Sequence, residues 1–399
     1  MIGIKNKLFL LLIIDNEIQV NLTAGILTKF IIKESTSLFC PIAEVIFTDT
    51  TGLVIDNYSK LCTGSLIFKA GYAGESGIED ITAHNHVLVT QKPSQLFTGL
   101  SSRSLTFDIV TWSDIGPKLT YGDHVRHFPE GSASSVITAL CAEEGIETGI
   151  IEPSIDAQFY IQAQWTNAQF IRYLADKAVS STNQRGFLYF TDREGKLTFS
   201  SPKYLYDQNV SNPIKLVFAN NPEYYSEHKD TVILSWTIKS NAQLYISSSS
   251  YGTVFKYFNP EEYKYNEELK QMSAEVSNFN FSAASLLNTQ FSDYSTSDYL
   301  GTKIVDDITM NTRAMSSLMD MSVLVNYNDN IKLGSVIEFY SYSTDEIEAT
   351  NKVIIDAISS KWVVCDISHQ VDKKSMNYYS WISVTRSGIG SKNTTNLMK

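Results

Sequence analysis

The sequence is poor in cysteine, in positive charge and in long apolar runs. Its four cysteines, Cys40, Cys62, Cys141 and Cys365, are widely spaced over 399 residues and form no C-x-x-C pair. Zinc sites and disulfide frameworks need cysteines at closer or regular spacing. The sequence therefore predicts reduced, mostly buried thiols and no structural metal.

Positive charge is also scarce. The chain has 32 Lys and Arg against 43 Asp and Glu, a formal net charge of −11. A protein that grips phosphate backbones needs clustered Lys and Arg, so this balance argues against nucleic-acid binding as the main task. It does not exclude a surface past which nucleic acid slides, because negative charge there would prevent sticking.

The longest apolar run near the N-terminus is residues 8–14, which follows Lys5 and Lys7 and superficially resembles a signal peptide. However, it continues directly into Asp15-Asn16-Glu17 without a small-residue cleavage site. It is also far too short to span a membrane. We expect it to be a buried strand, and no other stretch approaches membrane-spanning length.

Motifs of catalysis and cofactor binding are missing. There is no Gly-x-Ser-x-Gly elbow and no Walker-type loop, and Gly388-Ile389-Gly390 begins no dinucleotide fingerprint because no helix is expected in the residues that follow it. A glycosidase pair could lie among the acidic residues, but no pattern nominates one. The sequence predicts no enzyme and no catalytic, cofactor-binding or metal-binding residue, and it implies no cofactor.

Two histidine groups resemble metal sites only in part. His84 and His86 share one face of a predicted strand, but no nearby group supplies a third ligand, so a surface or lightly packed strand is favoured. His124 and His127 lack the i, i+4 spacing of a helical metal pair. Phe128-Pro129 beside them favours a loop.

The clearest local pattern begins at Trp165. Thr166 and Gln169 form a capping box at a helix start, and Trp165 and Phe170 are placed as a hydrophobic staple. Helical periodicity continues to Val179. Two predicted strands follow, 187–191 and 196–200, joined by the turn Asp192-Arg193-Glu194-Gly195.

Predicted strands dominate the rest of the chain. An earlier helix with the stripe Val136, Ile137, Leu140 and Cys141 ends at Gly145, and another is expected over 304–319. Loops are expected at 71–80 and 209–225, and residues 261–299 are polar and poorly periodic. The predicted strands are 17–22, 28–33, 43–48, 65–69, 86–90, 105–111, a hairpin of 232–238 with 243–247, 253–258, 321–327, 335–340, 361–368 and 378–385.

The two strand-rich parts echo one another. Residues 64–68 (GSLIF) correspond to 334–337 (GSVI), a later strand in each part lies beside a histidine, His86 or His369, and an alternating strand closes each part at 105–110 or 380–384. The order of these elements supports a duplication more strongly than the letters do. Two similar modules in one chain would be doubled again by a symmetric oligomer.

Taken together, these segments resemble the baseplate hub proteins of contractile-tailed bacteriophages and, more distantly, the hub part of type VI secretion spike proteins. The resemblance extends over residues 30 to 387 and has no catalytic fingerprint. It is carried by 127–131 (HFPEG), 164–174 (QWTNAQFIRYL), the hairpin 187–199, 234–241 (LSWTIKSN), the strand at Gly334, 364–369 (VCDISH) and the final strand 378–386. The loop 71–80 and residues 261–299 have no counterpart in this pattern.

The resemblance implies a β-rich, multidomain α+β protein in which two similar tube-type β-barrels flank a small α+β domain and a less regular insertion. The expected divisions are 1–118 for the first barrel, completed by 225–248, then 119–208 for the middle domain, 209–303 for the crossing and peripheral region, 304–388 for a helix and the second barrel, and 389–399 for a flexible tail.

The same resemblance implies a structural, non-enzymatic function in the virion. Three chains would form a pseudo-six-fold ring that joins the six-fold tail tube to the three-fold central spike and lines the DNA channel. The implied partners are two further copies of the chain, the tail tube protein, the spike protein and other baseplate proteins, with DNA passing unbound and no membrane insertion. Assembly is expected in the host cytoplasm. Two alternatives stay open: a peripheral tail protein whose tyrosines 245, 251, 257, 263 and 265 bind cell-surface carbohydrate, and a tail-borne hydrolase.

Overall fold

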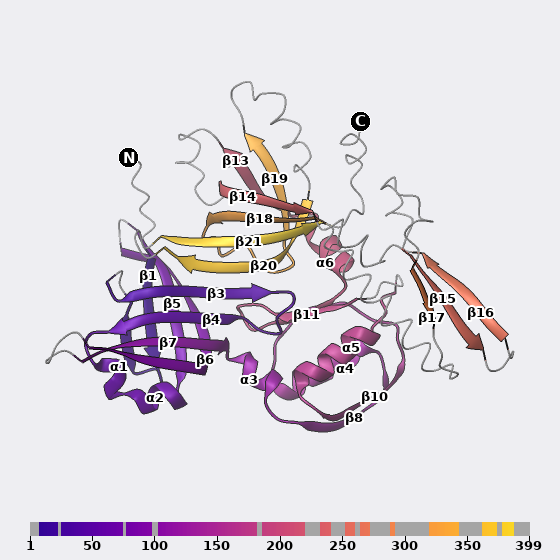
Figure 1. The fold of residues 1–399 in the computed structure, drawn as a ribbon, viewed down its shortest axis with the longest axis horizontal. Helices are drawn as coiled ribbons and strands as arrows, with labels where there is room; N and C mark the ends of the chain where they lie inside the picture. The colour runs from indigo at the N-terminus through magenta and orange to yellow at the C-terminus, as the bar shows by residue number, and fades with distance from the viewer. Residues whose placement is uncertain are drawn as a thin grey trace.

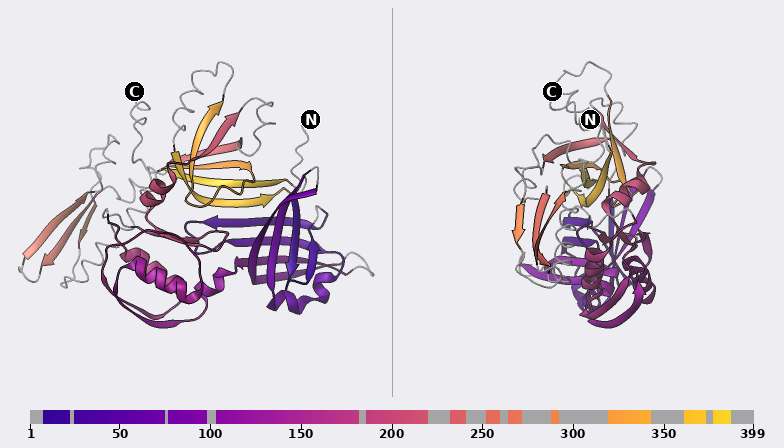
Figure 2. Two further views of the ribbon diagram at one scale, coloured as in Figure 1. Left: turned by 180° about the vertical axis from the view of Figure 1, so that it is seen from behind. Right: turned by 90° about the vertical axis from the view of Figure 1, so that its right-hand side faces the viewer.

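The computed structural model gives a β-rich chain with a few short helices (Figures 1 and 2). It describes residues 8–22, 25–74, 77–97, 103–181, 186–219, 232–240, 252–259, 264–271, 288–291, 319–342, 361–372 and 377–386. The predicted strand 243–247, the tail after 386 and the predicted helix 304–319 lie outside these residues, except that Met319 is described and begins a strand.

The N-terminal region, indigo to purple in Figure 1, is a curled sheet with two short helices at one end. The run 8–14 is a strand, as predicted, whose alternate side chains Leu10, Leu12 and Ile14 are fully buried. The elements are β1 (Leu8–Ile14), β2 (Ile18–Asn21), β3 (Leu27–Ser35), β4 (Ile42–Asp49), α1 (Leu53–Asp56), α2 (Tyr58–Thr63), β5 (Ser65–Gly74), β6 (Gly77–Phe97) and β7 (Arg103–Ser113).

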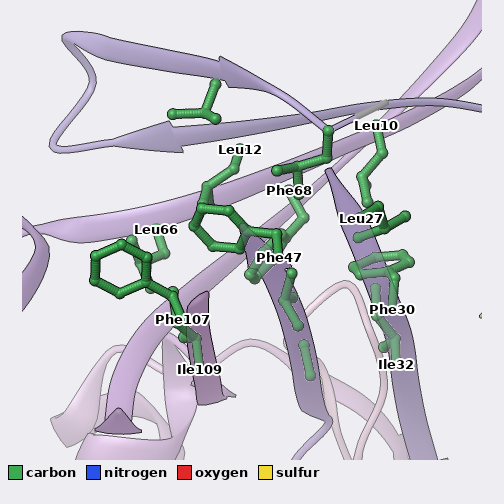
Figure 3. Packing of buried hydrophobic residues seen from close by; sticks show 14 of the residues in the cluster. Leu10, Leu12, Leu27, Phe30, Ile32, Phe47, Leu66, Phe68, Phe107 and Ile109 are labelled. Atoms are coloured by element: carbon green, nitrogen blue, oxygen red, sulfur yellow. The ribbon is translucent and has the colours of Figure 1, made fainter. Parts of the chain in front are cut away.

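The core of this region lies inside the curl. Phe30 of β3, Phe47 of β4, Phe68 of β5 and Phe107 of β7 all point into it (Figure 3). Phe47 and Phe107 are cross-strand partners and stack with 5.5 Å between ring centroids. Alternation along each strand therefore closes an apolar interior, as a half-buried sheet requires.

The middle region is a separate α+β cluster with its own core. The capping box at Thr166 and Gln169 is present, and the ring centroids of Trp165 and Phe170 lie 6.4 Å apart, both as predicted. Ser132 caps the preceding helix, and Gly145 ends it in the left-handed conformation. The elements are α3 (Ile115–Thr120), β8 (His124–Gly131), α4 (Ala133–Glu144), β9 (Thr148–Ile151), β10 (Gln158–Trp165), α5 (Asn167–Lys177), β11 (Leu188–Thr191), β12 (Leu197–Ser200) and α6 (Pro202–Asn209).

The third region returns to strands, rose red (β13, β14) to yellow (β21) in Figure 1. Its core contains Met321, Val323, Trp362, Val364 and Ile382, all fully buried. The elements are β13 (Ile214–Ala219), β14 (Ile233–Ser240), β18 (Met319–Asn326), β19 (Val336–Tyr342), β20 (Lys361–Val371) and β21 (Tyr378–Arg386). A small separate sheet holds β15 (Gly252–Asn259), β16 (Lys264–Gln271) and β17 (Asn288–Phe291).

The first and third regions share one 13-stranded sheet. Its order is β14-β18-β21-β20-β3-β4-β7-β6-β5-β1-β2, with β19 added to β20 and β13 added to β19. Strand β20 joins the two regions, because it pairs with β19 over 361–363 and with β3 over 366–370. In the third region the first and last strands of the series, β14 and β13, come together, since Val217 of β13 bridges to Val232 just before β14.

The strand order is duplicated. The series β3-β4-β7-β6-β5 and β14-β18-β21-β20-β19 occupy the same chain order, and every neighbouring pair in both is antiparallel. The β-bulges coincide as well. One falls between Leu27 and Lys29 of β3 and between Ile233 and Ser235 of β14. The other falls between 88 and 90 of β6 and between 364 and 366 of β20.

The coincident bulges fix which positions correspond. Position n of β3 matches n + 206 in β14, and position n of β6 matches n + 276 in β20. The alignment of 64–68 with 334–337 that was proposed from the sequence is therefore shifted by one residue. Val87 corresponds to Val363, and their partners are Ser65 and Val336, so Ser65 corresponds to Val336. His86 corresponds to Trp362 and not to His369. The repeated order of elements is present, although the identities that first indicated it are not aligned.

Several expectations are wrong. The proposed completion of the first barrel by 225–248 fails for its described part, because β14 pairs with β18, where Ile233 lies against Val325. The crossing 209–225 contains β13, and the loop 71–80 is mostly the ends of β5 and β6. Four short helices, α1, α2, α3 and α6, are present that were not predicted from the sequence. Helix α1 lacks a capping residue directly before its first turn. Asp49 caps it from several residues away, with Oδ2 accepting hydrogen bonds from the N–H groups of Val54 and Ile55.

Candidate functional site

The three regions meet at a group of charged and polar side chains, all buried except Asp329, which we call the junction cluster: Glu34, Arg193, Tyr327, Asp329 and His369. Glu34 and His369 lie on the paired strands β3 and β20, and Arg193 lies in the turn between β11 and β12. The Arg193 side chain is only 4% exposed and that of Glu34 only 1%. Charges this deeply buried occur when each has a partner.

Arg193 makes the largest number of contacts in the cluster. Its Nε lies 3.4 Å from Glu34 Oε1, and its backbone N–H donates to Glu34 Oε2 at 3.2 Å. The two Nη atoms donate to Asp329 Oδ1 at 3.0 Å, to the Tyr327 hydroxyl at 3.3 Å and to the Ile331 carbonyl. One side chain of the middle region thus contacts both strand regions.

His369 completes the contact between β3 and β20. Its Nε2 lies 3.2 Å from Glu34 Oε1, and its Nδ1 lies 2.8 Å from Ser380 Oγ. The Tyr327 ring packs edge-on against the imidazole, with centroids 5.0 Å apart, and stacks on Tyr378 at 4.4 Å. The imidazole is therefore held by polar partners at both nitrogens and by aromatic rings.

The electrostatics favour one charge state. Burial raises the pKa of Glu34, but Arg193 and then His369 outweigh it, so the pKa lies below its ordinary value. Burial lowers the pKa of His369, and the contact with Glu34 offsets this only in part. At neutral pH Glu34 is ionised, Arg193 is charged and His369 is neutral. The cluster is a paired structural site, and its carboxylate already has partners.

The predicted histidine pair on β6 lies close to this cluster. His84 and His86 are 2% and 3% exposed, so the expectation of a surface or lightly packed strand is wrong. Burial lowers their pKa values to about 4 and about 3. His86 Nδ1 lies 3.1 Å from Thr111 Oγ1. No group of three His, Cys, Asp or Glu suited to a metal ion occurs among the described residues.

The second histidine pair lies on a strand. Residues 124–131 form β8, which pairs with β10, so the predicted loop at Phe128-Pro129 is wrong. Phe128 turns inward and stacks on Phe170 at 5.4 Å. His127 lies on the other face and stacks on Phe159 at 6.3 Å.

That other face of β8 and β10 is apolar and exposed. Val125 is 74% exposed, Phe159 65% and Ile161 55%. Exposed apolar side chains gathered on one face commonly mark an interaction surface. Of the five tyrosines named above, Tyr257 and Tyr265 fall on the described strands β15 and β16, and the other three lie outside the described residues.

The junction cluster had one signal in the sequence that the analysis did not use. Phe30, Ile32 and Glu34 alternate on the inward face of β3, so a carboxylate occupies a position where an apolar residue is expected. Its partner Arg193 gave no signal, because it lies in an ordinary turn more than 150 residues away.

Among the described helices, none is long and apolar enough to cross a membrane.

The sequence matches no family model and none of the curated proteins. Solved structures do match. The 43 kDa tail protein of prophage MuSo2 from Shewanella oneidensis has a TM-score of 0.56 at 11% identity, covering 96% of this chain and 99% of that one. The tail protein from Neisseria meningitidis MC58 has a TM-score of 0.54 at 10% identity, covering 96% and 98%.

A third similar structure belongs to the PdpA-VgrG complex of Francisella. Its TM-score is 0.53 at 10% identity, and the match covers 96% of this chain but 58% of that one. Identities this low establish the fold alone. The predicted resemblance to phage baseplate hub proteins, and to the hub part of type VI secretion spike proteins, is confirmed as a likeness of fold.

Proposed function

We propose that this protein is a structural hub of a phage tail baseplate. Three copies form a ring with pseudo-six-fold symmetry, which joins the six-fold tail tube to the three-fold central spike and surrounds the DNA channel. The protein acts by geometry and performs no chemical reaction. The shared fold with phage tail proteins supports a role in the tail, and the finer assignment rests on the arrangement of the strands.

The observation that carries the proposal is the duplicated strand order with coincident bulges. Two modules of the same topology, joined edge to edge by β20 and β3, give one chain two equivalent units. Three chains then supply six units, which is what a contact with a six-fold partner requires. We take these units to be two tube-type β-barrels at about residues 1–118 and 304–388, the second completed by β14, with 119–208 between them.

The middle region and the small sheet of β15, β16 and β17 within the insertion 209–303 differ from the repeated modules and so occur only three times in the ring, whereas β13 and β14 belong to the sheet of the second module. The middle region and this small sheet are the parts suited to the three-fold spike and to other baseplate proteins. The net charge of −11 supports a channel that repels DNA and lets it slide. Mapping charge on the inner wall of an assembled ring tests this, and a basic wall contradicts it.

The ring itself is tested by mass photometry and negative-stain averaging of the purified chain, alone and co-expressed with the neighbouring tail proteins. A trimer whose averages show six similar density lobes is the expected result. A chain that stays monomeric under all these conditions overturns the hub assignment. Specific glycan binding by such a monomer would then establish the peripheral, carbohydrate-binding alternative.

A further inference from the structure

Two strand edges are open in the described part of the chain, and they belong to corresponding strands of the two modules. On β6, strand β5 occupies one edge only as far as Val87, so residues 88–97 lack a partner strand on that side among the described residues. On β14, the edge away from β18 carries, as far as the described residues go, only the bridge between Val232 and Val217. Unpaired edges of this kind are templates for another chain.

The chain itself shows how such edges pair. Strand β3 corresponds to β14, and β20 corresponds to β6. Within one molecule, β20 continues past its pairing with β19 and joins β3, with Asp366 opposite Ser35 and Gln370 opposite Ile31. The pairing between modules is thus already formed once inside the molecule.

We propose that residues 237–240 of β14 in one copy pair antiparallel with residues 91–94 of β6 in the next copy, repeating the contact between β3 and β20. The inference rests on the proposed ring and specifies the contact between neighbouring copies, which we call the seam. Applying the two offsets to the register of β3 and β20 places Gln91 opposite Ser240 and Ser94 opposite Thr237. The contact is heterologous, so it produces a closed ring when the rotation between copies closes.

Exposure on β14 supports this assignment. Phe30 on β3 is 1% exposed, because β3 lies between β4 and β20. Its counterpart Trp236 is 39% exposed, although the cross-strand neighbour Val323 is fully buried. Ser235 and Thr237 are exposed as well. A second copy on this edge would give β14 the neighbour that β3 already has.

The same register shows that this seam is weaker than the contact within the chain. The counterparts of Glu34 and His369 are Ser240 and Pro93, so the seam has no junction cluster. The Asp114 N–H donates a hydrogen bond to the Asn85 carbonyl, so the backbone of Asn85 points toward β7. Successive residues of β6 then point alternately toward β7 and toward the open edge, and the bulge between 88 and 90 shifts this alternation by one residue, which places the Pro93 nitrogen on the open edge. Proline donates no hydrogen bond, so the ladder loses one bond there. The seam is therefore suited to forming during assembly, whereas the contact between β3 and β20 is permanent.

Cysteine cross-linking tests the register. Ser94 and Thr237 form a pair whose backbone groups point away from the seam, so their Cα atoms would lie about 4.5 Å apart, within disulfide range. The matched control joins Ser94→Cys with Ser235→Cys, whose diagonal separation is about 7–8 Å. Both use a Cys62→Ser background, because Cys62 is exposed and lies 2.9 Å from Gln91 Nε2.

On mild oxidation of the full chain, S94C/T237C should give disulfide-linked dimers and trimers on a non-reducing gel, and S94C/S235C should not. Hydrogen exchange of the unmodified protein provides an independent readout, in which amides of 91–95 and 236–240 become protected on assembly. A trimer that shows neither result overturns the seam and leaves the ring intact. Failure to assemble at all overturns both.

Discussion

Replacing Arg193 by methionine tests whether the junction cluster holds the three regions together. Methionine keeps most of the aliphatic stem but removes the guanidinium, so packing changes little and the charge is lost. In the native protein this guanidinium contacts Glu34, Asp329 and the Ile331 carbonyl. The substitution leaves Glu34 as a buried carboxylate whose remaining side-chain partner in the cluster is a neutral imidazole.

The structure gives the size of the effect. Removing one partner of a buried ion pair costs about 3–5 kcal/mol, because an uncompensated charge stays in a medium of low polarity. That corresponds to a shift of about 10²–10⁴ in the unfolding equilibrium. The matched control is Lys203→Met, which breaks an exposed i, i+4 pair with Asp207 at 3.0 Å. Pairs of that kind contribute about 0.5 kcal/mol or less.

Urea unfolding, followed by both fluorescence and circular dichroism, measures the difference. We expect the Arg193→Met midpoint to fall well below that of Lys203→Met, and Glu34→Gln added to Arg193→Met to recover part of the loss. The cost of Arg193→Met should also shrink as pH falls, because protonation of Glu34 removes the unpaired charge. A loss below about 1 kcal/mol would refute the reasoning, because surface pairs reach that size.

The remaining predictions concern acid, a helix cap and a turn. His84 and His86, with pKa values lowered to about 4 and about 3, bind protons more readily once unfolded, so stability is lost as pH falls below about 6.5. At pH 5 each should cost about 2 kcal/mol, measured as the urea midpoint against pH, and a flat profile from pH 7 to 5 would contradict it. Thr166→Ala should cost about 1 kcal/mol through the lost cap of α5, whereas Thr166→Ser should cost little. Gly195→Ala should lower the melting temperature, because Gly195 has φ +81° and a Cβ there would lie 3.2 Å from Ile115 Cγ1; an unchanged melting temperature would show that the turn can relax.

Local structure could be read from the sequence wherever neighbouring residues determine it. The α5 cap, the staple at Trp165 and Phe170, and the hairpin around Gly195 all depend on residues a few positions apart. The buried run 8–14 was predictable for the same reason, because its apolar length is a local property.

Long-range partners could not be read in this way. Strand β14 has an ordinary alternating pattern, and nothing within it indicates β18 in preference to a first-region strand. The junction cluster joins Glu34, Arg193 and His369, which are separated by more than 150 residues along the chain. The duplication was visible only as an order of elements, because its bulge positions appear only once the strands are paired.

Strand β20 has a mechanical consequence. This strand is hydrogen-bonded to strands of both halves. One half can therefore rotate against the other only if the backbone hydrogen bonds between residues 366–370 and β3 break. Each net hydrogen bond lost there costs about 0.5–1.5 kcal/mol, and the buried charges nearby add to the barrier. The two halves therefore move as one rigid unit, and in the proposed ring any widening has to occur between molecules.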